Sequence, residues 1–374
     1  MALSGKSHEQ TRLKFIMRII FKTSYLQDIK LLKHSGYWFW YGLLLLAVLL
    51  APAVLDEFYI GEMAFIYIYA IAGLGLMIPV GFTGLPSLGH AAFMAIGAYT
   101  HGYFLSQGFP FLVSMALAGI FGLVVGALIT IPLKRMTGIY FAIASLAFAI
   151  IVEEIIAHWK SVTGGLAGLA VDVPVFFGFA LEETWHFYFL CLAVLLGVLY
   201  CTLNLVRSPS GRAFIAIRDS EISAESMGIN LSIYKIKSFA ISGCFTGLAG
   251  ALFAHRLYYL TPDAFNFLLS IQLLMMVVVG GLGTVHGAIF GAIFVGLLPQ
   301  AIAIAKDHLP PAIGEMPGLE PGLFGVIMVL FIIFEPMGLY GRWVKLKLFF
   351  QMFPLYRKAT FKRQKTYLKT ERVQ

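Results

Sequence analysis

The residues best suited to chemistry lie in one glycine-rich stretch, residues 81–99, where Ser87 precedes His90 by three positions. An ionisable side chain inside a hydrophobic run is by default a functional candidate, and a serine near a histidine suggests a hydrolase that cuts within the membrane. The pair stands alone, because no separate helix carries a base beside it. We therefore expect no catalytic residue. His90 is equally well explained as a neutral histidine hydrogen-bonded at a helix start.

The same stretch is expected to interrupt a helix. Pro86 lacks a backbone donor, and Gly81, Gly84 and Gly89 loosen the chain around it. Freed amides at the start of the next half-helix carry partial positive charge that suits a carboxylate. The alternative is that the small residues around Gly97 only let neighbouring helices pack closely. We favour packing for the helix as a whole and keep a pore-lining role for its first turn.

A second segment resembles the first. Residues 281–290 match residues 84–93 at a constant offset of 197. Chance could produce a match this short, but each copy interrupts a hydrophobic run at a glycine-rich point, which indicates the discontinuous helices and substrate path of a transporter. We therefore predict a substrate pathway lined by residues of both copies, namely Gly84, Ser87, Gly89, His90, Phe93, Gly281, Gly283 and Thr284.

The polar loop 207–237 is the second informative segment. Asp219 or Ser220 can cap a short helix there, which Gly228 can end. Its apolar residues, Ile222 and Met227, lie beside charged ones. Such a helix could lie on the membrane surface. Its two carboxylates argue against an anionic bilayer and favour a protein partner.

Composition limits the class of protein. Of 374 residues, 59% are hydrophobic and 12% charged, about half the charge of a soluble domain. This excludes a secreted domain, a disordered chain and a nucleic-acid-binding module. The three cysteines lack metal-ligand spacing, so no metal site is expected. Residues 163–169 are glycine-rich but lack the lysine of a phosphate-binding loop, so we expect a tight outer turn or a short re-entrant lid there and no cofactor in this chain.

The hydrophobic runs predict an all-α, polytopic bundle of about ten membrane-spanning helices. The predicted spans are Tyr37–Leu55, Ile60–Val80, Ser87–Leu105, Phe111–Ile131, Ile139–Ala157, Phe187–Val206, Ser238–Leu257, Phe267–Gly281, His286–Ala305 and Gly322–Tyr340. Between them, acidic residues lie at span ends, and Glu153 could pair with Arg256.

Charge predicts the orientation of the bundle. Of 27 lysines and arginines, 17 lie in two basic tails, residues 1–36 and 341–374, which flank the transmembrane domain 37–340. Cations collect on the cytoplasmic side of a membrane and are held there by anionic lipid. Both termini and the loop 207–237 are therefore expected in the cytoplasm.

Several motifs together resemble the LivM-like permease subunit of branched-chain amino acid type ABC importers. They occur in the family's order, and they are Ser87–Tyr99, Thr163–Leu169, Ser208–Arg218, Ala224–Asn230, Gly280–Thr284 and Glu335–Leu339. Each is weak alone, and together they cover roughly residues 60–340. Pro86 departs from the family, in which glutamine is commoner, and so do the long basic tails. Pro86 puts a conventional amino-acid substrate in doubt.

The resemblance implies a heteromeric importer in the bacterial inner membrane. A sister permease subunit would complete the pore, two ATP-binding subunits would carry ATP and Mg, and a periplasmic binding protein would deliver a small polar or carboxylate solute. The loop would dock on the ATPases through a coupling helix at residues 221–228. The implied coupling residues are Arg212, Arg218, Glu221, Ala224, Glu225 and Gly228.

The main alternative is an ion-coupled secondary transporter of a small carboxylate. Such a protein needs acidic relay residues in mid-span, and the predicted spans have none well inside them. A non-transporting scaffold is a further alternative, and it would not need paired helix breaks.

Overall fold

The computed structural model describes residues 35–176, 179–180, 183–307, 319–335 and 337–352. The chain divides into two compact units, Leu31–Tyr340 and a second one made of Met1–Lys30 and Gly341–Gln374. Residues 1–34 and 353–374, most of both basic tails, lie outside the described residues, so the predictions made for them stay predictions. In the second unit the structure describes the part of helix α17 (Gly338–Met352) that follows Tyr340.

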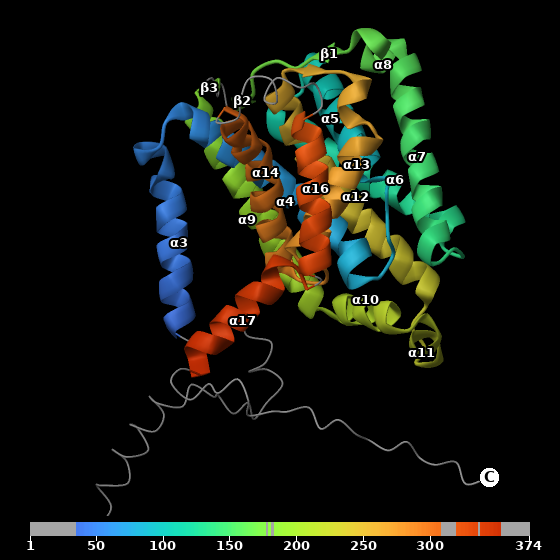
Figure 1. Cartoon of the computed structure of the whole chain (residues 1–374). Helices are drawn as coiled ribbons and strands as arrows, with labels where there is room; N and C mark the ends of the chain where they lie inside the picture. Colours follow the sequence, from blue (N-terminus) through green and yellow to red (C-terminus); the bar gives the residue numbers. More distant parts are fainter. Residues whose placement is uncertain (1–34, 177–178, 181–182, 308–318, 336, 353–374) are drawn as a thin grey trace, which may run out of the picture. The chain divides into compact units, whose positions relative to one another are not determined.

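The larger unit is a bundle of long apolar helices (Figure 1). In chain order they are α3 (Ser35–Val54), α4 (Glu57–Met77), α5 (His90–Ser106), α6 (Phe111–Leu133), α7 (Gly138–His158), α9 (Thr184–Arg207), α12 (Leu231–Leu257), α13 (Phe267–Gly280), α14 (Val285–Asp307) and α16 (Leu319–Phe334). Within the described ranges, seven helices are long and apolar enough to cross a membrane, or eight if α16 and α17 form one bent span.

The other two predicted spans correspond to α3 and α5, which do not meet that test of length and apolarity. The apolar part of α3 is Phe39–Val54, and α5 has 17 residues. All ten predicted spans therefore coincide with helices, and the predicted all-α membrane bundle is confirmed.

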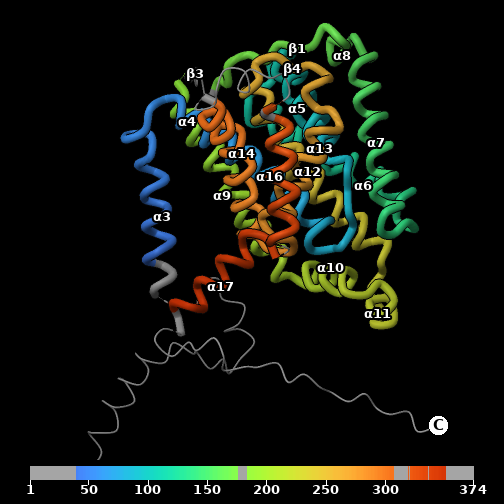
Figure 2. Tube along the Cα trace, viewed as in Figure 1, coloured from blue at the N-terminus to red at the C-terminus, as the bar shows by residue number. Residues whose placement is uncertain are grey.

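Helix α12 is largely buried and packs against α4, α5 and α6 (Figure 2). Glycines set the closest contacts. A Cβ added at Gly122 of α6 would lie 2.2 Å from the carbonyl oxygen of Gly243, and one added at Gly97 of α5 would lie 2.1 Å from that of Gly247. Both distances are far below a van der Waals contact, so the helices meet backbone to backbone. Gly97 therefore has the packing role that its sequence context favours.

The predicted helix break after α4 is present. The chain leaves α4 through a π-helical turn, η1 (Ile78–Phe82), and an irregular segment before α5 begins. Pro79 within η1 lacks an amide hydrogen and cannot continue the regular ladder. Thr83 N instead donates to Ile78 O at 3.1 Å, the wider spacing of a π-turn. Pro79 is thus a determinant of the break in addition to Pro86.

The glycine-rich segment after α7 forms the expected tight turn. It comprises α8 (Lys160–Thr163) and η2 (Gly165–Ala167), and Gly164 and Gly168 have φ of 73° and 81°, a region that glycine enters freely. Strand β1 (Leu169–Ala170) then pairs antiparallel with β4 (Tyr259–Leu260), with Leu169 opposite Leu260. A second short ladder joins β2 (Val175–Phe176) to β3 (Phe179–Ala180), and η3 (Pro262–Phe265) precedes α13.

Two short helices, α10 (Pro209–Asp219) and α11 (Glu221–Ser226), lie at the opposite end of the bundle from α8 and β1 (Figure 1). Ser220 caps α11, because its hydroxyl accepts from Ser223 N at 3.2 Å. Gly228, with φ of 82°, turns the chain out of the helix. The predicted short helix in this loop is confirmed, with Ser220 as its cap.

Candidate functional site

The first helix break is held by serines of neighbouring helices. Leu88 N donates to Ser145 Oγ of α7 at 2.9 Å, and Ala91 N donates to Ser270 Oγ of α13 at 3.0 Å. A backbone amide without a partner in a membrane costs several kcal/mol, and these hydroxyls remove that cost. Two of the amides that the sequence offers to a carboxylate are therefore bonded within the protein.

His90 is buried, and both of its ring nitrogens have partners. Its Nδ1 lies 2.9 Å from Ser87 Oγ, and its Nε2 lies 2.8 Å from Ser242 Oγ of α12. Phe93 packs edge-on against the imidazole, with ring centroids 5.4 Å apart. This is the arrangement of a neutral histidine that ties a helix start to its neighbour.

The other predicted pathway residues of this segment also lie among packed helices. Gly89 is so close to α7 that an added Cβ would lie 2.4 Å from Ser145 O. Phe93 belongs to a small apolar cluster with Leu85, Phe141 and Phe239. Contact of Ser87, Gly89, His90 and Phe93 with a substrate stays a prediction.

The second break lies between α13 and α14 and touches the first. Gly281 and Gly283 have φ of 117° and 74°, and Thr284 Oγ1 accepts from Gly287 N at 3.1 Å as α14 begins. Gly283 N donates to Met77 Sδ at 3.3 Å. A Cβ added at Gly81 would lie 2.7 Å from Gly283 N. The structure therefore brings Gly81 and Gly283, 202 residues apart in the sequence, into backbone contact.

Arg218, at the end of α10, lies against this contact. Its Nη1 donates to Gly81 O at 3.3 Å, and Cβ atoms added at Gly283 and Gly84 would lie 2.9 and 3.0 Å from its side chain. Arg218 came from the predicted coupling set, and Gly84 and Gly283 from the predicted pathway. The two sets, separate in the sequence analysis, meet here.

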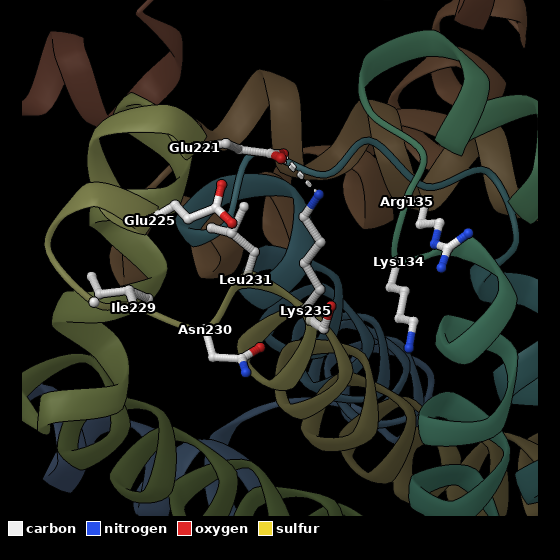
Figure 3. Close-up of a pocket in the computed structure, with 10 residues that line it drawn as sticks. Lys134, Arg135, Glu221, Glu225, Ile229, Asn230, Leu231 and Lys235 are labelled. Atoms are coloured by element: carbon white, nitrogen blue, oxygen red, sulfur yellow. Dashed lines mark hydrogen bonds and ion pairs between the residues drawn. The ribbon is translucent and has the colours of Figure 1, made fainter.

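Glu221 points inward, although the resemblance implies that it docks on a partner. Both of its carboxylate oxygens lie 2.9 Å from Nζ of Lys235 on α12, and the lysine side chain is 1% exposed (Figure 3). Ala224 is buried as well. These contacts fasten α11 to the central helix of the bundle.

Beside this ion pair is an open depression of about 680 Å³. Glu221 and Glu225 line one part of it, and Lys134 and Arg135 from the connection between α6 and α7 line another (Figure 3). Its remaining lining residues are Gly228, Ile229, Asn230, Leu231, Ser232 and Lys235.

The outward face of α11 is apolar as well as acidic. Ile222 is 84% exposed and Met227 83% exposed, at the end of the bundle that carries α10, and Glu225 and Gly228 are exposed between and beside them. Arg212 of α10 is exposed too, and its Nη1 donates to Arg207 O at 3.3 Å. Helix α11 and the residue after it therefore combine large exposed apolar side chains with exposed charge.

Sequence reasoning missed several residues that hold this site together. Lys235 lies inside the loop predicted at residues 207–237, where a cation gives no sign of burial, whereas in the structure it belongs to α12. The serines that hydrogen-bond to the first break could have been predicted more easily, because hydroxyl groups inside long apolar runs need partners. They are Ser145, Ser238, Ser242 and Ser270.

At the other end of the bundle, Arg256 pairs with Glu62 of α4 at 3.0 Å. The pairing considered from the sequence, with Glu153, is not the one formed. Helix α4 begins at Glu57, which places Glu62 beside the end of α12.

These features define a polytopic membrane protein with two helix breaks and a polar loop that carries two short helices. Residues 59–334 match the family model described as "Branched-chain amino acid transport system / permease component". This match covers more than half of the chain, which therefore belongs to that family of ABC importer permeases. It is a transporter component that crosses the membrane several times.

Curated relatives agree with the family. The chain is 35% identical over 301 residues to the high-affinity branched-chain amino acid transport system permease protein LivM of Escherichia coli strain K12, covering 73% of this chain and 67% of the relative. It is 26% identical over 271 residues to the autoinducer 2 import system permease protein LsrC of Salmonella paratyphi B, covering 68% and 75%. Among solved structures, PsaBC from Streptococcus pneumoniae in complex with Fab matches with a TM-score of 0.42 and 15% identity, covering 81% of this chain and 99% of that one.

Proposed function

We propose that this chain is the permease subunit of an ATP-driven importer in a bacterial inner membrane, with both termini in the cytoplasm. With a sister permease it forms the path of a small polar or carboxylate solute, such as a branched-chain amino acid, that a periplasmic binding protein delivers. ATP and Mg are held by two partner subunits. Family membership supports the permease role, and the relatives named above include permeases of amino-acid and autoinducer import systems.

The observation that carries the proposal is the two-sided construction of α11. Its inner side is fixed to α12 by the Glu221–Lys235 pair and by buried Ala224. Its outer side presents Ile222 and Met227, each more than four-fifths exposed. A helix that is anchored on one side and apolar on the other suits docking by a partner that moves it. Since this chain has no nucleotide motif, the energy for transport comes from that partner.

Substrate contacts are proposed to be few, and selectivity then rests mainly with the binding protein. Gly84, Gly283 and Thr284 are at least partly exposed, whereas Ser87 and His90 are buried with protein partners. The path is therefore proposed to pass beside the break segments and their freed backbone groups.

Removing the outer apolar pair tests the docking role. The importer carrying Ile222→Ser with Met227→Ser is purified from its own membrane in detergent, and ATP hydrolysis in the eluate is measured together with the protein bands. We expect the ATP-binding subunits to be lost, because an apolar anchor dominates an interface. Ile233→Ser, which alters another exposed apolar residue outside α11, is the control and should retain them.

A charge reversal gives an independent test of the same surface. Glu225→Arg should also dissociate or uncouple the ATP-binding subunits without unfolding the chain. An intact complex with normal ATP-driven uptake in both variants would refute docking through α11. Uptake by this chain alone in proteoliposomes, driven by an ion gradient without ATP, would support a secondary transporter of a small carboxylate.

A further inference from the structure

One side chain contacts both helix breaks. Arg218 Nη1 donates to Gly81 O at 3.3 Å in the first break. The same nitrogen would lie 2.9 Å from a Cβ at Gly283 in the second break, and Gly84 would meet Arg218 Cγ at 3.0 Å. We call Gly81, Gly84 and Gly283 the break junction. The Arg218 side chain fits there because these residues are glycines, and a side chain at any of the three positions would clash with its neighbours.

Asp219 fixes the direction of the guanidinium. Its Oδ1 accepts from Arg218 Nε at 3.1 Å and from Nη2 at 3.0 Å. These two bonds occupy one edge of the planar group and leave Nη1 free to reach Gly81 O. The pair ends α10 and immediately precedes α11, so any displacement of α11 acts on Arg218 through a connection of two residues.

The break junction covers a buried layer of α4. Met77 is fully buried, and its Sδ accepts from Gly283 N at 3.3 Å. If Arg218 moved away, Gly81 O would lose a charge-assisted donor and the contact between Gly81 and Gly283 would lose its cover. Met77 would then be the first buried side chain to face the aqueous side.

We propose that Arg218 is a positioning residue that latches the two helix breaks together, and that movement of α10 and α11 releases both breaks at once. The inference rests on the proposed function in one respect, since the partner docked on α11 supplies the movement. The latch itself follows from contacts within this chain. It explains why the loop residue that lies between the docking surface and the membrane is an arginine, because a lysine cannot serve Asp219 and Gly81 O with fixed geometry.

Accessibility of a buried cysteine tests the latch. In the purified importer, in nanodiscs, the native cysteines Cys191, Cys201 and Cys244 are replaced by alanine and Met77→Cys is introduced as the reporter. A hydrophilic maleimide that does not enter lipid is then added to the solution. We expect Arg218→Gln to raise the labelling rate roughly tenfold, the factor that a hydrogen bond from a charged group contributes. Arg218→Lys should give a smaller rise.

Two controls separate release of the latch from general loosening. Lys237→Gln removes an exposed cation that lies over the Tyr234 ring and should leave Met77→Cys labelling unchanged. Ile71→Cys, buried in the middle of α4, should stay unlabelled in the Arg218→Gln background.

Unchanged labelling of Met77→Cys in Arg218→Gln would overturn the latch, and so would equal labelling of Ile71→Cys. The ratio of substrate-stimulated to basal ATP hydrolysis should fall in Arg218→Gln while the complex stays intact, and an unchanged ratio would also count against the latch. Whether the Ile222→Ser, Met227→Ser variant loses the ATP-binding subunits tests the proposed function and not the latch. Labelling of Met77→Cys can be measured whether or not those subunits are bound.

Discussion

The Glu221–Lys235 pair shows that the residue type alone does not decide whether a glutamate faces a partner or the interior of the bundle. The resemblance to the permease family implied that Glu221, like Glu225, belongs to the docking surface. The structure directs it inward to a lysine that is 1% exposed, whereas the Glu221 side chain keeps 30% of its exposure. The two partners of this ion pair are therefore buried to very different extents.

This difference in burial predicts that Glu221→Gln destabilises the protein more than Lys235→Met does. Glu221→Gln leaves a buried ammonium group without its carboxylate and should lower the free energy of unfolding by about 3 kcal/mol. Lys235→Met should cost roughly half of that or less, because methionine suits a buried site and Glu221 can turn toward the open depression. Thermal unfolding in detergent compares the two variants. A larger loss in Lys235→Met would contradict the contacts described.

A second residue-scale prediction concerns His90. Ser242→Ala removes the partner of Nε2 and should lower stability by about 1–3 kcal/mol, the cost of leaving a buried polar group unpaired. Uptake assays should show an unchanged apparent KM, because His90 is buried and keeps its bond to Ser87 Oγ. A clear change in KM would support contact between His90 and the substrate. Ser226→Ala, which alters an exposed serine on α11, provides the stability control.

At the scale of elements, the spans were predictable because a helix that crosses a membrane must bury about 20 apolar residues in lipid. The break in the first repeat was predictable too, from glycine and proline in an apolar run. Sequence reasoning placed both breaks on one pathway, but it missed the contribution of Pro79 and the direct backbone contact between the two breaks. The first requires the backbone geometry of η1, and the second depends on how α4, α13 and α14 pack, which no local pattern encodes.

Helix crossings supply an element-scale prediction. A Cβ added at Gly250 of α12 would lie 2.0 Å from Met94 O on α5, whereas one at Gly197 of α9 meets nothing within 4 Å. Gly250→Ala should therefore lower the unfolding temperature, with a cost of about 1–3 kcal/mol. Gly197→Ala should change stability by no more than about 0.5 kcal/mol. Equal effects of both substitutions would mean that the α5–α12 distance is not set by the glycine.

At the scale of the whole molecule, we predict that the two ends of the transmembrane unit face opposite sides of the membrane. Leu166 in the turn after α7 is 76% exposed and Met227 after α11 is 83% exposed. Helix α9, of 24 residues or about 36 Å, lies between them in the chain and is long enough to cross the membrane. In intact cells, a cysteine at Leu166 should react with an impermeant maleimide and one at Met227 should not. Reaction of both from one side would refute the orientation.

The glycine crossings of α12 have a mechanical consequence. Where side chains separate two helices, their rotamers can change and absorb a displacement. At Gly243 and Gly247 the neighbouring backbones touch directly, so there is almost no slack to take up. A shift applied at one end of α12 must therefore reappear at the other end as motion of the whole helix. The bundle is therefore stiff along the axis of α12, which joins its two ends.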